Sequence, residues 1–96
     1  MSKNNIKKVS EEDLKVLKVI VQEGKATIGT EDVLKKIKAG ELAKIFLANN
    51  CPQKVKSDLE YYTQLRSIPI FLLEMNNEEL GVFCKKNYFI SVLGTA

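Results

Sequence analysis

The chain has 96 residues, of which 45% are hydrophobic, and its 15 basic and 12 acidic side chains give a formal net charge of +3 at pH 7. This length suits one small domain, and no apolar run approaches the ~20 residues that a membrane-spanning helix needs. With no histidine and only two cysteines, the sequence offers almost no metal ligands, and we expect neither a metal nor another cofactor. The polar first residues lack the apolar stretch of a secretory signal, so we expect a cytoplasmic protein with no membrane partner.

The first predicted elements are a flexible basic arm, residues 1–9, and a helix that opens a single domain of residues 10–96. Ser10 is a suitable N-cap, because its hydroxyl oxygen accepts from a free amide of the first turn. The helix should end near Glu23, since Gly24 readily takes the left-handed conformation that stops a helix. Its apolar stripe indicates core packing and carries no chemistry.

A short strand, Lys25–Ile28, and an amphipathic helix over residues 31–39 come next. We expect Thr30 to be the N-cap of this helix and Gly40 to end it. Gly29 leaves backbone amides open at the helix start, and such amides suit a phosphate group. A well-capped, solvated helix with no ligand explains the same pattern.

The unbroken apolar run Ile45–Ala48 predicts a strand that is buried on both faces. Asn49 and Asn50 follow it, Pro52 stops it, and apolar residues then recur at helical spacing up to residue 66. In such strand–helix units, binding sites usually lie at the carboxyl end of the strand. The two asparagines are therefore the first candidate site residues.

Residues 68–73 predict another strand, and Pro69 indicates that it lies at the sheet edge or begins just after the proline. Asn76 caps the following helix in a capping box with Glu79. Gly81 permits close approach to a neighbour or ligand. The apolar side of this helix is expected to hold Leu80, Val82 and Phe83.

A basic loop, Lys85–Tyr88, and a final strand, Phe89–Leu93, complete the pattern. Strands that alternate with helices predict an α/β fold, here a three-layer α/β/α sandwich with a four-stranded mixed sheet. Cys51 and Cys84 are expected to be free thiols, because their spacing fits no metal motif and the cytosol is reducing. No catalytic triad, nucleophile elbow or phosphate-binding glycine loop is present, so the sequence predicts no enzyme.

Three loops should lie at related edges of this sandwich, namely residues 29–32, 49–52 and 85–88. Together they combine amides that read base edges, lysines that hold phosphates and an aromatic ring that covers a nucleotide. Tyr88 is explained equally well as a half-buried strand residue. Tyr61 and Tyr62 fit core and helix-surface positions better than stacking platforms.

Four segments carry a family resemblance: Leu47–Pro52 (LANNCP), Lys56–Tyr62 (KSDLEYY), Glu79–Gly81 (ELG) and Cys84. In these segments the chain resembles the large-subunit ribosomal protein thirty of eukaryotes and archaea, a branch of the kink-turn RNA-binding superfamily. The similarity runs from about Gly24 to Leu93. It implies a structural component of the large ribosomal subunit that stabilises a kink-turn in ribosomal RNA. Neighbouring ribosomal proteins and the small subunit are the further partners that it implies.

The resemblance also implies a binding site. In such families the loop before the second helix enters the kink, and the loop before the last strand closes over a flipped-out base. With the adjacent lysines and Asn49 added, the candidate RNA-binding residues are Lys25, Gly29, Thr30, Glu31, Asp32, Lys35, Asn49, Asn50, Lys54, Lys56, Glu79, Gly81, Lys85, Lys86, Asn87 and Tyr88.

Two of these positions depart from the family pattern. Glu31 stands where lysine or asparagine is usual, so Asp32 and Lys35 are stronger candidates for contact. Lys85 replaces a common glycine, and we expect a differently shaped loop there.

Two other functions fit the sequence. One is a paralogous kink-turn protein of small ribonucleoprotein particles or recoding elements. The other is a protein-interaction module that uses Tyr61, Tyr62 and the lysine-rich helix 31–39.

Overall fold

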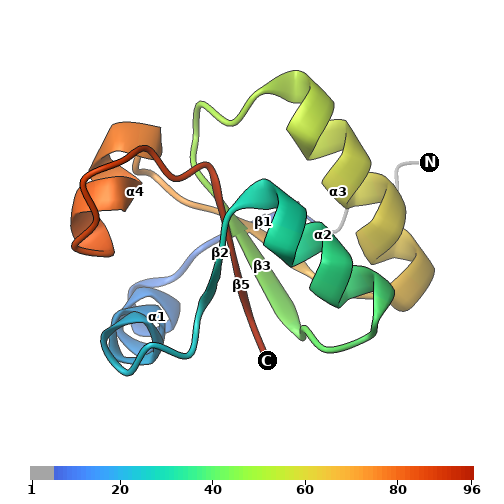
Figure 1. Cartoon of the computed structure of the whole chain (residues 1–96), viewed down its shortest axis with the longest axis horizontal. Coiled ribbons are helices and arrows are strands. Elements are labelled where there is room, and N and C mark those ends of the chain that lie inside the picture. The colour runs from blue at the N-terminus through green and yellow to red at the C-terminus, as the bar shows by residue number, and fades with distance from the viewer. Residues whose placement is uncertain (1–5) are drawn as a thin grey trace.

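A five-stranded mixed sheet organises the structure, a computed structural model that describes residues 6–96 (Figure 1). Its strands are β1 (Ile6–Lys8), β2 (Thr27–Ile28), β3 (Lys44–Leu47), β4 (Ile70–Leu72) and β5 (Val92–Thr95). They lie in the order β1-β4-β3-β5-β2, with β4 parallel to both β1 and β3 and β5 antiparallel to both β3 and β2. The predicted α/β class and mixed sheet are confirmed, and the predicted count of four strands is wrong.

The additional strand comes from the segment that was expected to be a flexible arm. Residues 6–8 pair in parallel with β4, with Ile6 opposite Ile70 and Lys8 opposite Leu72. Three residues with one apolar side chain form no recognisable strand pattern, so this pairing depends on the neighbouring strand and not on local sequence. The remainder of the expected arm, residues 1–5, lies outside the described residues.

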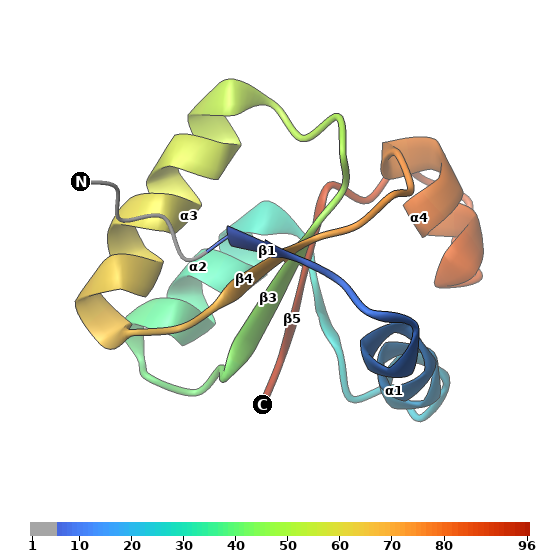
Figure 2. The same cartoon turned by 180° about the vertical axis from the view of Figure 1, so that it is seen from behind.

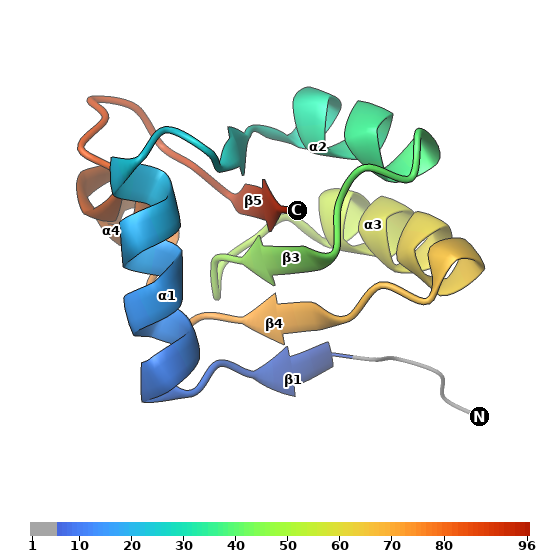
Figure 3. The same ribbon diagram turned by 90° about the horizontal axis from the view of Figure 1, so that it is seen from below.

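Four helices cover the two faces of the sheet (Figures 1 and 2). They are α1 (Glu11–Gln22), α2 (Thr30–Lys38), α3 (Gln53–Arg66) and α4 (Asn77–Phe83). The core divides accordingly into a cluster that contains residues of α2 and α3 and a cluster that contains residues of α1 and α4. Figure 3 shows α1 and α4 together at one end of the view and α2 and α3 at the other. None of the helices in residues 6–96 is both long and apolar enough to span a bilayer.

Strand β3 supplies side chains to both clusters. Ile45 and Leu47 pack with the α2–α3 cluster, whereas Phe46 and Ala48 pack with the α1–α4 cluster. Successive side chains of a strand point to opposite faces, so an unbroken apolar run is what a doubly covered strand requires. The prediction of a strand buried on both faces is therefore confirmed.

Helix starts follow the predicted chemistry at two positions and differ at one. The hydroxyl of Ser10 accepts from the amide of Asp13 at 3.1 Å. Asn76 and Glu79 form the predicted capping box. The N-cap of α2 is Gly29, with φ +103°, and Thr30 is already the first helical residue. Glycine takes this position because L side chains rarely adopt that backbone conformation.

The last third of the chain confirms one expectation and corrects two. Strand β4 begins just after Pro69, which is one of the two predicted alternatives, and the other does not apply because β1 pairs along its outer side. Strand β5 begins at Val92, later than predicted, and Phe89 is 68% exposed in the preceding loop. Val82 is 70% exposed and does not belong to the apolar side of α4, while Leu80 is buried.

Candidate nucleic-acid interface

The topology brings the three predicted loops to one edge of the sheet. Strands β3 and β4 are parallel, so the turns that follow them leave the sheet at the same edge. Strand β5 is antiparallel to β3 and therefore starts at that edge, and β2, antiparallel to β5, ends there. We call this edge, with residues 29–32, 49–52, 74–77 and 85–91, the loop edge; it lies along the top of Figure 1.

Two asparagines join the β3–α3 turn to the β4–α4 turn. The Asn49 side chain donates to the carbonyl of Glu74 at 2.8 Å, and its backbone amide donates to the carbonyl of Met75 at 2.8 Å. Asn50 donates through Nδ2 to Oδ1 of Asn77 at 3.1 Å and accepts through Oδ1 from the Asn77 amide at 2.8 Å. These asparagines are therefore structural in part, because they hold the two turns in a fixed relation.

Backbone hydrogen bonds extend this connection across the loop edge. The Ile90 amide donates to the carbonyl of Asn77 at 3.0 Å, which ties the segment after α4 to the start of α4. The Ala48 amide donates to Ser91, and the Gly29 amide donates to Val92, at 2.9 and 3.2 Å. The start of α2, the β3–α3 turn and the α4–β5 loop thus form one continuous surface.

The α4–β5 loop is supported from beneath by Gly81. A Cβ atom at this position would lie 2.2 Å from the backbone oxygen of Tyr88, so only glycine allows the observed approach. The predicted close approach is confirmed, and the neighbour is the backbone of the loop itself.

Lys85 occupies the left-handed region with φ +60°, just after α4. Its amide donates to Val82, and the amide of Lys86 donates to Gly81, both at 2.9 Å. This bonding pattern is the common glycine-type helix ending. Lys85 thus adopts the left-handed backbone conformation that glycine favours. A difference in loop shape was expected from the replacement of glycine by lysine, but φ at this position is one that glycine would also adopt.

The exposed tip of the loop is basic and aromatic. Tyr88 is 53% exposed and Phe89 is 68% exposed, and Lys85, Lys86 and Asn87 are exposed beside them. Of the two explanations for Tyr88, the structure favours the exposed loop residue, because β5 starts four positions later. The loop therefore offers an open aromatic face next to positive charge.

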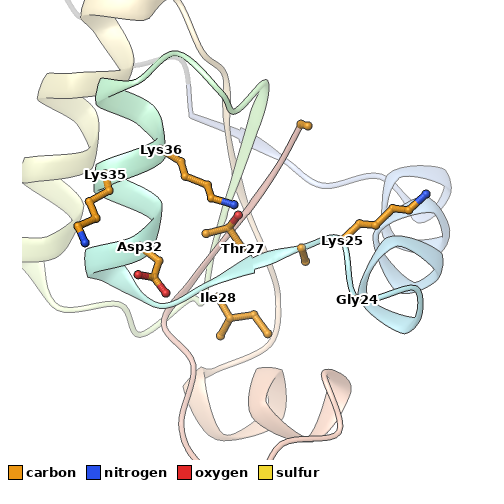
Figure 4. Close-up of a pocket in the computed structure, with 9 residues that line it drawn as sticks. Gly24, Lys25, Thr27, Ile28, Asp32, Lys35 and Lys36 are labelled. Atoms are coloured by element: carbon orange, nitrogen blue, oxygen red, sulfur yellow. The ribbon is translucent and has the colours of Figure 1, made fainter.

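The first turns of α2 carry Glu31, Asp32 and Lys35, all exposed. Figure 4 shows Asp32 and Lys35 on α2 at an open pocket of about 700 Å³ that continues along β2. Lys25 lies across this pocket beside α1, and its ammonium is 3.6 Å from Glu23. Lys25 is thus at the margin of the surface, apart from the bonded loops.

The remaining candidates lie on helices next to the loop edge. Lys54, in the first turn of α3, is 3.5 Å from Asp58, and this exposed pair leaves its side chain accessible. Lys56 is half-buried near Cys51. Burial raises the pKa of the Cys51 thiol, and the nearby Lys56 ammonium opposes that shift. Both cysteines are free, as the sequence predicts.

Two residues of the loop edge were not identified from the sequence. Asn77 is the partner of Asn50 but lies 27 positions further along the chain, and no local pattern connects them. Phe89 begins an apolar run that is typical of a strand, so its exposure had no signal in the sequence.

Fold and loop edge together define a class: an α/β/α sandwich with polar loops at one edge of the sheet, one of which carries two exposed lysines and two exposed aromatic side chains. Exposed cations beside open rings suit an anionic polymer. Residues 11–96 match the Ribosomal protein L7Ae/L30e/S12e/Gadd45 family, and the chain belongs to this family.

Two relatives show which members of this family the chain resembles. The chain is 36% identical over 89 residues to large ribosomal subunit protein eL30 of Tetrahymena thermophila, covering 92% of this chain and 86% of that protein. It is 35% identical over 79 residues to eL30 of Methanococcus vannielii, covering 82% and 75% respectively. The predicted family resemblance is thereby confirmed, and these relatives are structural ribosomal proteins, not enzymes.

The fold also resembles that of a 15.5 kD RNA-binding protein from Giardia lamblia, with a TM-score of 0.76. That likeness covers 93% of this chain and 78% of the other at 17% identity, so it concerns the fold alone.

Proposed function

We propose that the protein is a structural component of the large ribosomal subunit that binds and stabilises a kink-turn in ribosomal RNA through its loop edge. The observation that carries the proposal is the hydrogen-bonded connection of the start of α2, the Asn49–Asn50 turn and the α4–β5 loop into one surface. The names of the ribosomal relatives support the same assignment. Ribosomal RNA, neighbouring ribosomal proteins and small-subunit contacts are the partners in this proposal, and the ribosome is its location.

A kink-turn brings phosphates of two strands close together and leaves a base outside the helical stack. Lys85 and Lys86 of the loop edge, and Lys35 and Lys54 on the adjacent helices, reduce the repulsion between those phosphates because their charge is positive. Each ammonium that pairs with a phosphate also releases a condensed counterion. The open amides at the Gly29-capped start of α2 add donors for phosphate or base edges. Asp32 accepts from base-edge amino groups.

The exposed ring of Tyr88 covers the extruded base in this proposal. Its backbone is held against Gly81, so the position of the loop is defined before RNA binds and less backbone entropy is lost on binding. Asn50 uses one N–H and one lone pair of its amide on Asn77. A primary amide has a further N–H and a further lone pair, and these are the groups that Asn50 offers to RNA.

A binding comparison tests the proposal. The parent protein is titrated with a kink-turn RNA and with a continuous duplex of equal length, at one fixed salt concentration. We expect markedly tighter binding to the kink-turn, because the duplex offers neither crowded phosphates nor an extruded base. Equal affinity for the two RNAs contradicts the proposal.

Tyr88→Ala tests the stacking contact. Loss of one stacked base costs about 1–3 kcal/mol, which corresponds to about a 5- to 150-fold weaker Kd. Tyr61→Ala is the matched control, because Tyr61 is a tyrosine on α3 of similar exposure, 61% against 53% for Tyr88. A loss of affinity that is the same for both variants removes Tyr88 from the site.

Lys35→Ala tests the phosphate contact. The slope of log K against log salt should become shallower by about 0.9, the contribution of one phosphate contact. Lys18→Ala is the control, because Lys18 is exposed on α1, on the other face of the sheet. Identical slopes for Lys35→Ala and the parent exclude a phosphate contact at this position.

A further inference from the structure

A second exposed surface lies at the far ends of α2 and α3. A groove of about 180 Å³ is lined there by Ile37, Lys38, Tyr62, Leu65 and Arg66. We call it the α2–α3 groove. Lys38 is the last residue of α2, about 12 Å along the helix axis from its first residue at ~1.5 Å per residue. The groove therefore faces away from the loop edge, and Figure 1 shows these helix ends opposite α4.

Apolar side chains border the groove on the surface of α3. Leu65 is 68% exposed and Tyr61, one helical turn earlier, is 61% exposed. Residues four apart are neighbours on a helix, so the two side chains form a continuous apolar patch. Single exposed apolar residues are common, but a tyrosine–leucine pair beside a groove is typical of a protein-binding surface.

The polar groups of the groove are cations held in place. The Lys38 ammonium lies 4.8 Å from the centre of the Tyr62 ring. The Arg66 guanidinium donates from Nη2 to the Lys38 carbonyl at the end of α2. This bond uses one of the five N–H donors of a guanidinium, and the other four can donate to a carboxylate.

The charged residues that line the groove are all positive. Among the described residues, none of those that line it is acidic, and the exposed Glu41 lies three positions after Lys38. Asp58, one turn before Tyr61–Tyr62 on α3, is partly neutralised by Lys54 at 3.5 Å. The groove is therefore apolar at its centre and positive at its margin.

A nucleic acid fits this surface less well than a polypeptide. The Tyr62 ring meets the Lys38 ammonium and, edge-on, the ring of Tyr61 at 5.1 Å between centroids. Those contacts occupy ring surface that a base needs for stacking. The groove volume of about 180 Å³ is on the scale of one large side chain.

We propose that the α2–α3 groove binds an acidic segment of a partner protein, which inserts one apolar side chain beside Leu65 and places carboxylates on Arg66 and Lys38. Tyrosine and arginine are the residue types that most often dominate such interfaces. The loop edge stays free, so the partner and RNA bind at the same time. This inference does not depend on the proposed RNA function.

The test uses a short fluorescein-labelled peptide of glutamate and aspartate with one central phenylalanine, added to the full chain and followed by fluorescence polarisation. We expect saturable binding that weakens about tenfold, or about 1.4 kcal/mol, in Leu65→Asp. The exposed carboxylate repels the peptide and removes the apolar contact. Val16→Asp is the matched control, because Val16 is 54% exposed on α1, on the other face of the sheet, and it should bind as the parent does.

Three comparisons complete the test. A lysine version of the peptide, and an acidic version with glycine in place of phenylalanine, should bind at least about tenfold more weakly than the original. No saturable binding of the original peptide, or equal losses in Leu65→Asp and Val16→Asp, overturns the proposal. Tighter binding of a single-stranded RNA at a site that Leu65→Asp disrupts also overturns it, since the groove is then a nucleic-acid surface. Circular dichroism checks that both variants are folded.

Discussion

Gly81→Ala tests how closely α4 and the loop above it are packed. Alanine stabilises a helix interior by about 1 kcal/mol relative to glycine. The new methyl group, however, would lie 2.2 Å from the Tyr88 backbone oxygen, and no side-chain rotation can relieve that contact. Overpacking of this kind costs about 1–3 kcal/mol, and the upper part of that range applies because backbone must move.

The net expectation is a loss of about 1–2 kcal/mol in the free energy of unfolding. In a domain of this size that corresponds to a Tm lower by about 4–16 °C. Urea unfolding followed by circular dichroism measures it. The control is Val82→Ala in the same helix, which is 70% exposed and should change stability by less than about 0.5 kcal/mol. If Gly81→Ala is as stable as the parent or more stable, the packing argument is refuted.

Three further predictions concern the loop edge and its support. Lys85→Gly should raise the free energy of unfolding by about 1 kcal/mol, because Lys85 is in the left-handed region that disfavours L side chains; a decrease in urea unfolding contradicts this. Asn50→Ala should lower stability by about 1–3 kcal/mol through loss of two hydrogen bonds to Asn77, and thermal unfolding unchanged from the parent argues against that tie. Burial raises the pKa of the Cys84 thiol, with Lys86 opposing, so the neutral thiol is favoured in the folded state. The resulting stability is present below the unfolded pKa of about 8.5 and is lost as pH rises through the folded pKa. The stability difference between the parent and Cys84→Ala should therefore shrink in alkaline urea titrations, and a growing difference is incompatible with this sign.

Local patterns predicted the parts of the fold that local chemistry determines. The caps at Ser10 and Asn76 and the doubly buried strand β3 depend on residues close together in the chain, and all three are confirmed. Strand β1 could not be predicted in this way, because Ile6–Lys8 is a strand only through its pairing with β4. The extension of β5 beyond Leu93 has a similar cause, since Gly94 and Thr95 are buried strand residues of types that a hydrophobic pattern does not select.

The candidate site likewise has features that local sequence predicts and features that depend on contacts between distant segments. Alternating strands and helices were sufficient to predict that residues 29–32, 49–52 and 85–88 lie at related edges. The bonds that connect them, between Asn50 and Asn77 and between Ile90 and Asn77, join positions far apart in sequence and required coordinates. Tyr88 is exposed for a reason that local pattern could not supply, namely that β5 starts only at Val92.

The most direct test of the central claim maps the RNA footprint on the protein. Amide chemical-shift changes of the isotope-labelled chain are recorded by NMR as a kink-turn RNA is added. The account predicts that the largest changes fall together on residues 29–35, 49–56 and 85–90, while the ends of α2 and α3 change little. Large changes confined to the α2–α3 groove, or spread evenly over both faces of the sheet, would contradict the claim that the loop edge is one RNA-binding surface.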